Sequence, residues 1–445
     1  MVSKVLIANR GEIALRVLRA CRDLNLPSVV IYSEADRDSL PVRLADESVC
    51  IGPGPSSKSY LSIPNIISSA LITNCDAIHP GYGFLSEDRY FAEICGEYNL
   101  QFVGPPAAVI ARMANKAAAR QEMAAAGLPV LPGTESAVSS LDEAYLAART
   151  IGYPIMLKAA AGGGGRGMRV VHDQNELAQG FNLARVEARA AFDNDEVYLE
   201  HYLERCRHVE VQVLADVHGN VIHLADRECS IQRRHQKIIE EAPCKSIDEE
   251  LRQELGAAAV LGARALGFTS AGTLEFLVDD ARRYYFLEMN TRIQVEHGIT
   301  ELVTGIDIVK EQLQIAAGRP LSVGQEDVRP AGHAIECRVN AEAGAEFRPV
   351  TGRIDRLVLP GGPGVRVDTH LYAGYEIPPH YDSLVAKIMV HGRDRDEAVM
   401  RMRRALMETE IAGVATTLPY LHDVLYDPVF RMGRIYTDYV ASKAS

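Results

Sequence analysis

The sequence contains no tryptophan, and no two of its eight cysteines stand close enough to form a Cys-x-x-Cys pair. Paired cysteines mark structural zinc sites and small disulfide frameworks, so neither is indicated, and the pattern fits a reducing cytoplasm. No apolar run approaches the roughly 20 residues that cross a bilayer. The chain reaches a hydrophobic segment at 5–8, too early and too short for a signal peptide. We therefore expect a cytoplasmic protein with no membrane association.

Positive charge is also scarce. The 47 Lys and Arg residues are outnumbered by 59 Asp and Glu, which gives a formal net charge of −12. A chain with this charge repels polyanions, so we expect no nucleic-acid partner. At 445 residues and 47% hydrophobic content, the chain is long enough for several domains with buried cores.

Strand-like and helix-like segments alternate up to about residue 113. Apolar strands are predicted at 5–8 and 29–32, and the residues between them place their apolar side chains on one helix face. This β-α-β order predicts a parallel sheet. The turn at 9–12 lacks the G-x-G-x-x-G fingerprint, so a dinucleotide site is not indicated.

Apolar and polar side chains alternate along residues 285–296. In extended chain every second side chain shares a face, so five polar residues should project together: Glu288, Asn290, Arg292, Gln294 and Glu296. The run is long for one strand, and we expect a bend after Asn290. Such a row of polar residues either faces solvent or lines a site.

A second carboxylate is predicted beside this row. Residues 273–277 form a further predicted strand and 279–282 a turn, which would make a hairpin with Glu275 opposite Glu288. Two carboxylates so close repel unless a cation lies between them, and their oxygens suit Mg²⁺ shared with phosphates. Arg292 would suit a small planar anion. The alternative is a surface hairpin with salt bridges, which stabilise little.

A glycine-rich stretch, 161–167, lies between predicted strands at 153–158 and 168–171. Neither a helix nor Gly-Lys-Ser/Thr follows it, so it is not a Walker loop. A glycine loop between strands is typical of a flap that closes over phosphates, with Lys158 placed to meet them. The alternative is a flexible surface turn, but four consecutive glycines are entropically costly, which favours a ligand.

Four further segments leave alternatives open. The turn-rich tract 79–87 either lines a substrate or is a structural loop. Segment 197–203 runs from strand to linker and would suit an adenine edge. The basic run 230–237 is either a solvated patch or a small-anion site. A long helix is predicted over 300–317.

Arg338 is a separate candidate. The alternation in 333–338 places Glu336 and Arg338 on one face of a strand. An inward arginine is costly unless it meets an anion, so Arg338 either belongs to the site or forms a salt bridge between domains.

Taken together, these motifs resemble the biotin carboxylase family. The resemblance is carried by Glu-Met-Asn-Thr-Arg-Ile-Gln-Val-Glu-His from residue 288, the glycine flap, His-Pro-Gly-Tyr-Gly-Phe-Leu-Ser-Glu from 79 and Gln-Arg-Arg-His-Gln-Lys from 232. It runs nearly end to end and is strongest to the separate biotin carboxylase subunit of bacterial acetyl-CoA carboxylase.

The resemblance implies an α/β chain, α+β overall, in three domains. It implies an N-terminal parallel-sheet, Rossmann-like domain at 1–113 and an ATP-grasp domain at 114–328 with a mobile lid at about 130–203. A mixed α+β C-terminal domain would follow at 329–445. The family uses ATP, bicarbonate, two Mg²⁺ or Mn²⁺ ions and biotin on a biotin carboxyl carrier protein. Carboxyltransferase subunits and a homodimer are also implied.

Site residues follow from the same resemblance. Nucleotide phosphates would be met by Lys116 and Lys158, with Gly164 and Gly165 in the lid. The adenosine would be surrounded by Glu200, His201, Tyr202, Leu203, His208 and His235. The metal ligands, which also bind ATP, would be Glu275, Glu288 and Asn290. Bicarbonate would be held by Lys237, Arg292, Gln294 and Val295. Biotin would be bound by Tyr82 and Arg338.

The catalytic residues implied are Lys237, Arg292, Glu296 and Arg338. Glu296 would take the proton of bicarbonate, which would attack the γ-phosphate of ATP and form carboxyphosphate. Carboxyphosphate would break to CO₂ and phosphate, the phosphate would deprotonate biotin, and Arg338 would stabilise the enolate-like oxygen. Two positions depart from the family pattern: Ala161 at the start of the glycine run, and Gly298 where the family has proline. We expect them to affect rate more than activity.

Biotin is expected on a separate protein. The tetrapeptide 399–402, Val-Met-Arg-Met, superficially resembles a biotinylation site but carries Arg401 where the acceptor lysine must stand. Two other functions stay open: an ATP-grasp ligase with another acceptor such as an amine, and a non-catalytic nucleotide-binding subunit. The final acceptor could also be another acyl-CoA or pyruvate.

Overall fold

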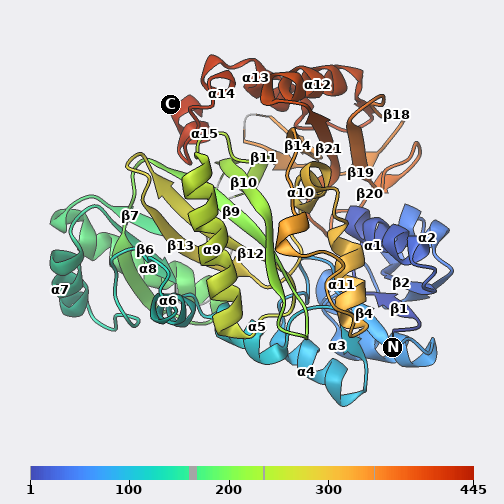
Figure 1. Cartoon of the computed structure of the whole chain (residues 1–445), viewed down its shortest axis with the longest axis horizontal. Coiled ribbons are helices and arrows are strands. Elements are labelled where there is room, and N and C mark those ends of the chain that lie inside the picture. The colour runs from blue at the N-terminus through green and yellow to red at the C-terminus, as the bar shows by residue number, and fades with distance from the viewer. Residues whose placement is uncertain (1, 160–167, 234–235, 345, 445) are drawn as a thin grey trace.

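The computed structural model describes residues 2–159, 168–233, 236–344 and 346–444. Three larger sheets organise the chain, with helices packed around them (Figure 1). The predicted fold class is confirmed: a parallel N-terminal sheet precedes a large, mainly antiparallel sheet and a C-terminal α+β region. Nowhere in the described ranges does a helix have both the length and the apolar character needed to span a bilayer.

The N-terminal sheet is parallel, as predicted, with strand order β3-β2-β1-β4-β5. Its strands are β1 (Val5–Ile7), β2 (Ser28–Tyr32), β3 (Glu47–Cys50), β4 (Ala77–His79) and β5 (Gln101–Phe102). The helices of this part are α1 (Gly11–Asp23), α2 (Leu40–Leu44), α3 (Ile63–Ile72), α4 (Arg89–Glu97) and α5 (Ala107–Ala114). Apolar side chains of α1 and β1 share one buried core, which explains the apolar helix face read from the sequence.

A small sheet of order β7-β6-β8 follows, and it carries the strands on either side of the glycine-rich stretch. Its strands are β6 (Ile155–Ala159), β7 (Arg169–Val171) and β8 (Val197–His201). The helices that pack on this sheet are α7 (Leu141–Ile151) and α8 (Gln174–Phe192), whereas the preceding α6 (Lys116–Ala125) packs on α5 and on β13 (Tyr284–Asn290) of the largest sheet. A compact core of its own lies between α7, α8 and these strands.

The largest sheet has eight strands in the order β13-β12-β9-β10-β11-β14-β21-β19. Its strands are β9 (Cys206–Ala215), β10 (Val221–Arg233), β11 (Gln236–Ala242), β12 (Ser270–Asp279), β13 (Tyr284–Asn290), β14 (His333–Asn340), β19 (Val365–Thr369) and β21 (Leu384–Gly392). Helix α9 (Glu249–Leu266) packs on β9 and β10, and α12 (Arg395–Glu408) packs on β14 and β21. One sheet thus contains strands from residue 206 to residue 392 and joins the middle of the chain to its C-terminal part.

Short elements complete the C-terminal part. Its two-residue and three-residue strands are β15 (Glu342–Ala343), β16 (Arg348–Pro349), β17 (Gly352–Arg353), β18 (Arg356–Val358), β20 (Glu376–Ile377) and β22 (Glu410–Ala412). Its remaining helices are α13 (Leu418–Tyr426), α14 (Pro428–Arg431) and α15 (Tyr439–Ala444). Arg401 lies within α12, so the 399–402 segment is part of a packed helix.

The prediction of one long helix over 300–317 is wrong. The chain forms two helices, α10 (His297–Thr304) and α11 (Ile308–Ala316). Gly305 has φ +73°, the left-handed conformation that ends a helix, and the Asp307 side chain accepts a hydrogen bond from Lys310 N to begin the next. The apolar residues of both helices fit one helical period, so the sequence pattern did not indicate the break between them.

His370 is buried beside the N-terminal part of the chain, and its ring packs edge-on against Tyr375. Burial, with Arg10 nearby, lowers the pKa of His370 to about 3. Above pH 6.5 the imidazole is neutral in both the folded and the unfolded chain. Below it the unfolded chain takes up a proton that the folded chain excludes, so stability falls as pH drops from 6.5 toward 3.

We therefore expect the free energy of unfolding to lose about 2 kcal/mol from this group between pH 7 and pH 5. In urea unfolding, His370→Phe should remove this contribution to the pH dependence of the free energy of unfolding. The control His172→Phe, at an exposed histidine, should leave the pH dependence unchanged. An unchanged pH dependence in His370→Phe would show that the buried ring does not resist protonation.

Candidate active site

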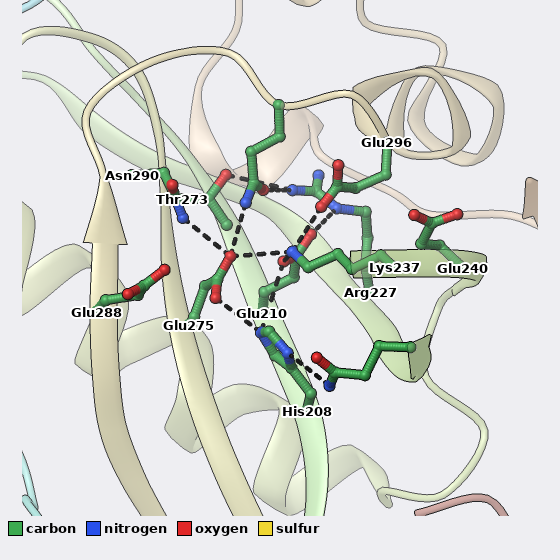
Figure 2. Close-up of polar contacts among 12 residues, drawn as sticks. His208, Glu210, Arg227, Lys237, Glu240, Thr273, Glu275, Glu288, Asn290 and Glu296 are labelled. Carbon is green, nitrogen blue, oxygen red and sulfur yellow. Dashed lines mark hydrogen bonds and ion pairs between the residues drawn. The ribbon is translucent and has the colours of Figure 1, made fainter. Parts of the chain in front are cut away.

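Two neighbouring strands of the large sheet bring the first pair of predicted carboxylates together. Strands β12 and β13 pair antiparallel, and Glu275 stands directly opposite Glu288, as predicted. Strand β13 ends at Asn290, so the expected bend after that residue is also confirmed. The following loop returns over the sheet and delivers Glu296 to the start of α10 (Figure 2).

Lys237 lies at the centre of the site, where it contacts three carboxylates (Figure 2). Its Nζ donates to Glu210 Oε2 at 2.5 Å, to Glu275 Oε1 at 2.9 Å and to Glu296 Oε1 at 2.6 Å. Burial would lower the pKa of this ammonium, but the three carboxylates raise it well above its ordinary value. Lys237 is therefore a permanently charged group within the site and not part of a solvated basic patch.

Arg227 is completely buried and contacts the other side of Glu210 from Lys237. It donates to Glu210 Oε1 at 2.5 Å and to Gln294 Oε1 at 2.6 Å. It also donates to Gln212 Oε1, Thr300 Oγ1 and Thr273 Oγ1. One guanidinium thus joins three strands to α10 and to the loop that carries Glu296.

Glu296 lies between Lys237 and Arg338 with only 2% of its surface exposed. Arg338 Nη2 donates to Glu296 Oε2 at 2.9 Å. Burial alone would raise the pKa of Glu296, but Lys237, Arg338 and Arg227 hold it well below its ordinary value. The carboxylate is therefore ionised at neutral pH, so it can accept a proton.

Arg338 is held at its other edge by a second acid. Its Nε donates to Glu240 Oε1 at 2.5 Å, and Glu240 is fully buried. Burial raises the pKa of Glu240 to about 7 even though Arg338 opposes the shift. Of the two interpretations of Arg338, site residue or salt bridge between domains, the contact with Glu296 places it in the same cluster as Lys237.

The loop after β13 carries the remaining predicted anion ligands. Arg292 Nη2 donates to Asn290 Oδ1 at 2.9 Å, and Gln294 Nε2 donates to Glu275 Oε1 at 2.8 Å. Asn290 Nδ2 also donates to Glu275 Oε1. The Val295 carbonyl accepts a hydrogen bond from Lys387 Nζ at 2.7 Å, which fixes the backbone just before Glu296.

Two ion pairs occupy the predicted nucleotide side. Lys116, at the start of α6, donates to Glu288 Oε2 at 2.7 Å, and Lys158 on β6 pairs with Glu200 on β8. Burial would lower the pKa of Lys116 and so would the nearby Lys158, but Glu288 raises it. Each lysine has a carboxylate partner that an anionic ligand would displace.

The other predicted ligands lie around this region. His208 Nε2 is 2.9 Å from Glu275 Oε2, which raises the pKa of the imidazole against the effect of burial. His201 ends β8, and Tyr202 N donates to the Pro154 carbonyl as the chain leaves that strand toward Leu203. Tyr82 donates from its hydroxyl to the buried carboxylate of Glu12. Gly164, Gly165 and His235, with Ala161, lie outside the described residues.

Sequence reasoning missed four residues that hold the site together: Glu87, Glu210, Arg227 and Glu240. A signal existed for Glu210, because His208, Glu210 and Gln212 alternate with valines along β9, as polar and apolar residues do in the segment around Glu288. Arg227 donates to Thr300, 73 positions away, and Glu240 accepts from Arg338, 98 positions away, so no local pattern singles these two residues out.

The donor set suits a divalent cation on the nucleotide side. Glu275 and Glu288 face each other and Asn290 adds an amide oxygen, all hard ligands of the type that Mg²⁺ takes with phosphates. Separately, one atom each from His208, Glu210 and Glu275 lie within 4.8 Å of one another, as do atoms of Glu210, Cys229 and Glu296. The Lys237 ammonium bonds to carboxylates of both groups, which makes them ion-pair clusters.

A large sheet whose acidic face is flanked by Lys158 of a smaller strand–glycine–strand unit and by Lys116 of α6 defines an ATP-grasp enzyme. Comparison with known families agrees. Residues 1–110 match the biotin carboxylase N-terminal domain, residues 115–323 the ATP binding domain of the carbamoyl-phosphate synthase L chain, and residues 336–442 the biotin carboxylase C-terminal domain.

Individual relatives extend over the whole chain. The biotin carboxylase of Pseudomonas aeruginosa is 54% identical over 444 residues, covering 100% of this chain and 99% of the relative. A pyruvate carboxylase subunit of Methanothermobacter thermautotrophicus is 52% identical, covering 99% of this chain and 90% of the relative.

A solved structure matches equally well. The biotin carboxylase domain dimer of Hydrogenobacter thermophilus 2-oxoglutarate carboxylase, in complex with MgADP, ADP and bicarbonate, superposes with a TM-score of 0.97 at 47% identity. The match covers 100% of this chain and 98% of that one. The chain belongs to the biotin carboxylase family, and it is an ATP-binding ligase of that family.

Proposed function

We propose that this enzyme carboxylates biotin on a carrier protein, through carboxyphosphate, as the first half-reaction of acetyl-CoA carboxylase in fatty acid synthesis. The observation that carries the proposal is the placement of Glu296, an ionised buried carboxylate between Lys237 and Arg338. A base there lies beside two cations that can hold an anion.

In the first step bicarbonate binds Lys237, Arg292, Gln294 and the backbone of Val295. Glu296 takes the bicarbonate proton, and the resulting oxyanion attacks the γ-phosphate of ATP, which releases ADP and forms carboxyphosphate. Lys116 and Lys158 leave their carboxylate partners and spread the charge of the phosphates. Glu200 to Leu203, with His208 and His235, surround the adenosine.

Divalent metal fits the acidic hairpin because its donors are hard oxygen ligands. Glu275, Glu288 and Asn290 would hold Mg²⁺ or Mn²⁺, with two ions expected, and the metal would neutralise negative charge on the nucleotide phosphates. Binding would separate Glu288 from Lys116, which frees that lysine for phosphate.

In the second step carboxyphosphate breaks to CO₂ and phosphate, the phosphate takes the N1′ proton of biotin, and the deprotonated N1′ attacks CO₂ to form carboxybiotin. Biotin lies near Tyr82 and Arg338, and the Arg338 guanidinium stabilises the negative oxygen of the deprotonated ureido group. Glu240 keeps that guanidinium in place. A lid at about 130–203, with Gly164 and Gly165, closes over the phosphates and excludes water.

The assembly proposed is a cytoplasmic homodimer that acts with a biotin carboxyl carrier protein and carboxyltransferase subunits. Its domains are 1–113, 114–328 and 329–445. Support for the acetyl-CoA branch comes from the sequence resemblance, and relatives named simply as biotin carboxylases, such as the Pseudomonas aeruginosa protein, are compatible with it. Relatives from pyruvate and 2-oxoglutarate carboxylases make those two acceptors the alternatives to test.

The acceptor can be tested with the tagged chain isolated together with its biotinylated carrier and carboxyltransferase. The complex is supplied with ATP, Mg²⁺ and ¹⁴C-bicarbonate, and then with acetyl-CoA, pyruvate or 2-oxoglutarate. We expect an acid-stable labelled product with acetyl-CoA alone. Label that appears only with pyruvate or 2-oxoglutarate would overturn the acetyl-CoA proposal.

A further inference from the structure

Arg292 reaches the site from the loop after β13, and its side chain is fixed on three sides. Its Nε donates to Glu87 Oε2 at 2.8 Å, its Nη2 to Asn290 Oδ1 at 2.9 Å and its Nη1 to the Ile293 carbonyl at 3.2 Å. Among the described residues these contacts use three of the five N–H donors of a guanidinium. One N–H on each terminal nitrogen is left for a two-point contact with a planar anion.

Glu87 belongs to the N-terminal part of the chain, and it fixes more than this one side chain. Its other oxygen, Oε1, accepts from Thr291 N at 3.0 Å and from Thr291 Oγ1 at 3.3 Å. The carboxylate therefore binds the backbone of the bend after β13 with one oxygen and the guanidinium of Arg292 with the other. This use of both oxygens sets it apart from an ordinary exposed ion pair, which contributes little.

The loop that carries Glu87 is itself held rigidly. Asn9 Nδ2 donates to the carbonyls of Pro80 and Tyr82, at 2.7 and 2.8 Å. Phe84 has φ +45°, a conformation that a bulky residue adopts only when its surroundings impose it, and its ring stacks on Tyr60 with centroids 5.0 Å apart. A strained, pinned loop is a suitable base for a residue that must hold another in place.

We infer that Glu87 is a positioning residue that presents Arg292 to bicarbonate from across the junction between the N-terminal sheet and the large sheet. The inference rests on the proposed function, since it takes bicarbonate as the ligand of Arg292. It also explains the end of the tract 79–87, which the sequence left open between a structural and a substrate-lining role.

The decisive variant is Glu87→Gln. Glutamine has one acceptor oxygen, so it can hold Arg292 or Thr291 but not both. We expect the KM for bicarbonate to rise about tenfold, as for the loss of one hydrogen bond to a charged group. The kcat at saturating bicarbonate should stay within about twofold and the KM for ATP should not change, because the base and the nucleotide site are intact.

Asp88→Asn is the matched control. It neutralises the next carboxylate along the chain, which accepts a hydrogen bond from Phe91 N and begins α4, a role that asparagine also fills. The KM for bicarbonate should be unchanged in this variant. Thermal unfolding of both variants then separates positioning from a general loss of stability.

Arg292→Ala distinguishes the inference from the function on which it rests. A raised bicarbonate KM in Arg292→Ala with a normal KM in Glu87→Gln would overturn the positioning role and leave the proposed function standing. ATP cleavage that does not respond to bicarbonate even in the unaltered enzyme would overturn the proposed function itself. The inference predicts a rise in Arg292→Ala at least as large as that in Glu87→Gln, and no further rise when Glu87→Gln is added to Arg292→Ala.

Discussion

Glu296→Gln is expected to reduce bicarbonate-dependent ATP cleavage by about 10²–10⁴-fold, the usual contribution of a general base. Glutamine has nearly the same shape, so it can still accept from Lys237 or Arg338, but it cannot take a proton. Neither predicted lysine contact with the nucleotide involves Glu296. The dissociation constant for ATP, measured by calorimetry, should therefore stay close to that of the unaltered enzyme.

The exposed Glu254→Gln serves as the control for this variant. Because Lys237, Arg338 and Arg227 keep the pKa of Glu296 well below its ordinary value, its protonation should not limit turnover anywhere above pH 5. Turnover of Glu296→Gln within about threefold of normal would exclude Glu296 as the base. Loss of ATP binding together with turnover would mean that the residue supports the site as a whole.

The second large effect is expected on stability. Arg227→Met should lower the free energy of unfolding by about 3–5 kcal/mol. The variant takes an ion-pair partner from the buried Glu210 and removes the hydrogen bonds that link three β-strands to α10. Lys237 would remain as a partner of Glu210 and limits the loss. Urea unfolding at pH 7 measures the change.

Two further variants sharpen this prediction. Arg264→Met removes an exposed arginine from α9 and should change stability by less than about 0.5 kcal/mol. Arg227→Lys keeps the positive charge but cannot make all of the guanidinium's hydrogen bonds, so we expect an intermediate loss of stability. A loss below about 1 kcal/mol in Arg227→Met would contradict the view that this residue organises the site.

The sequence predicted local geometry well where one rule decides it. Alternation placed Glu275 opposite Glu288 and ended the strand near Asn290, because side-chain period and strand length are local properties. The same reasoning failed at α10 and α11, where a single glycine conformation outweighed a continuous helical period.

The site itself was predicted less completely. Residues of one short segment, such as Asn290 and Gln294, could be grouped from spacing, and the family resemblance supplied Lys237 and Arg338. The residues that hold them could not be found in this way. Glu87 contacts Arg292 across 205 positions and Glu240 contacts Arg338 across 98, and pairing over such distances depends on how the sheets are joined.

Nucleotide turnover with each substrate supplied in turn tests the central claim most directly. The purified chain is given Mg²⁺ and ATP, and ADP release is measured with bicarbonate alone, free biotin alone and both together. A strong rise is expected only when both are present, since the base acts on bicarbonate and biotin receives the product. ADP release that is indifferent to biotin and rises with another acceptor, such as an amine, would contradict biotin carboxylation.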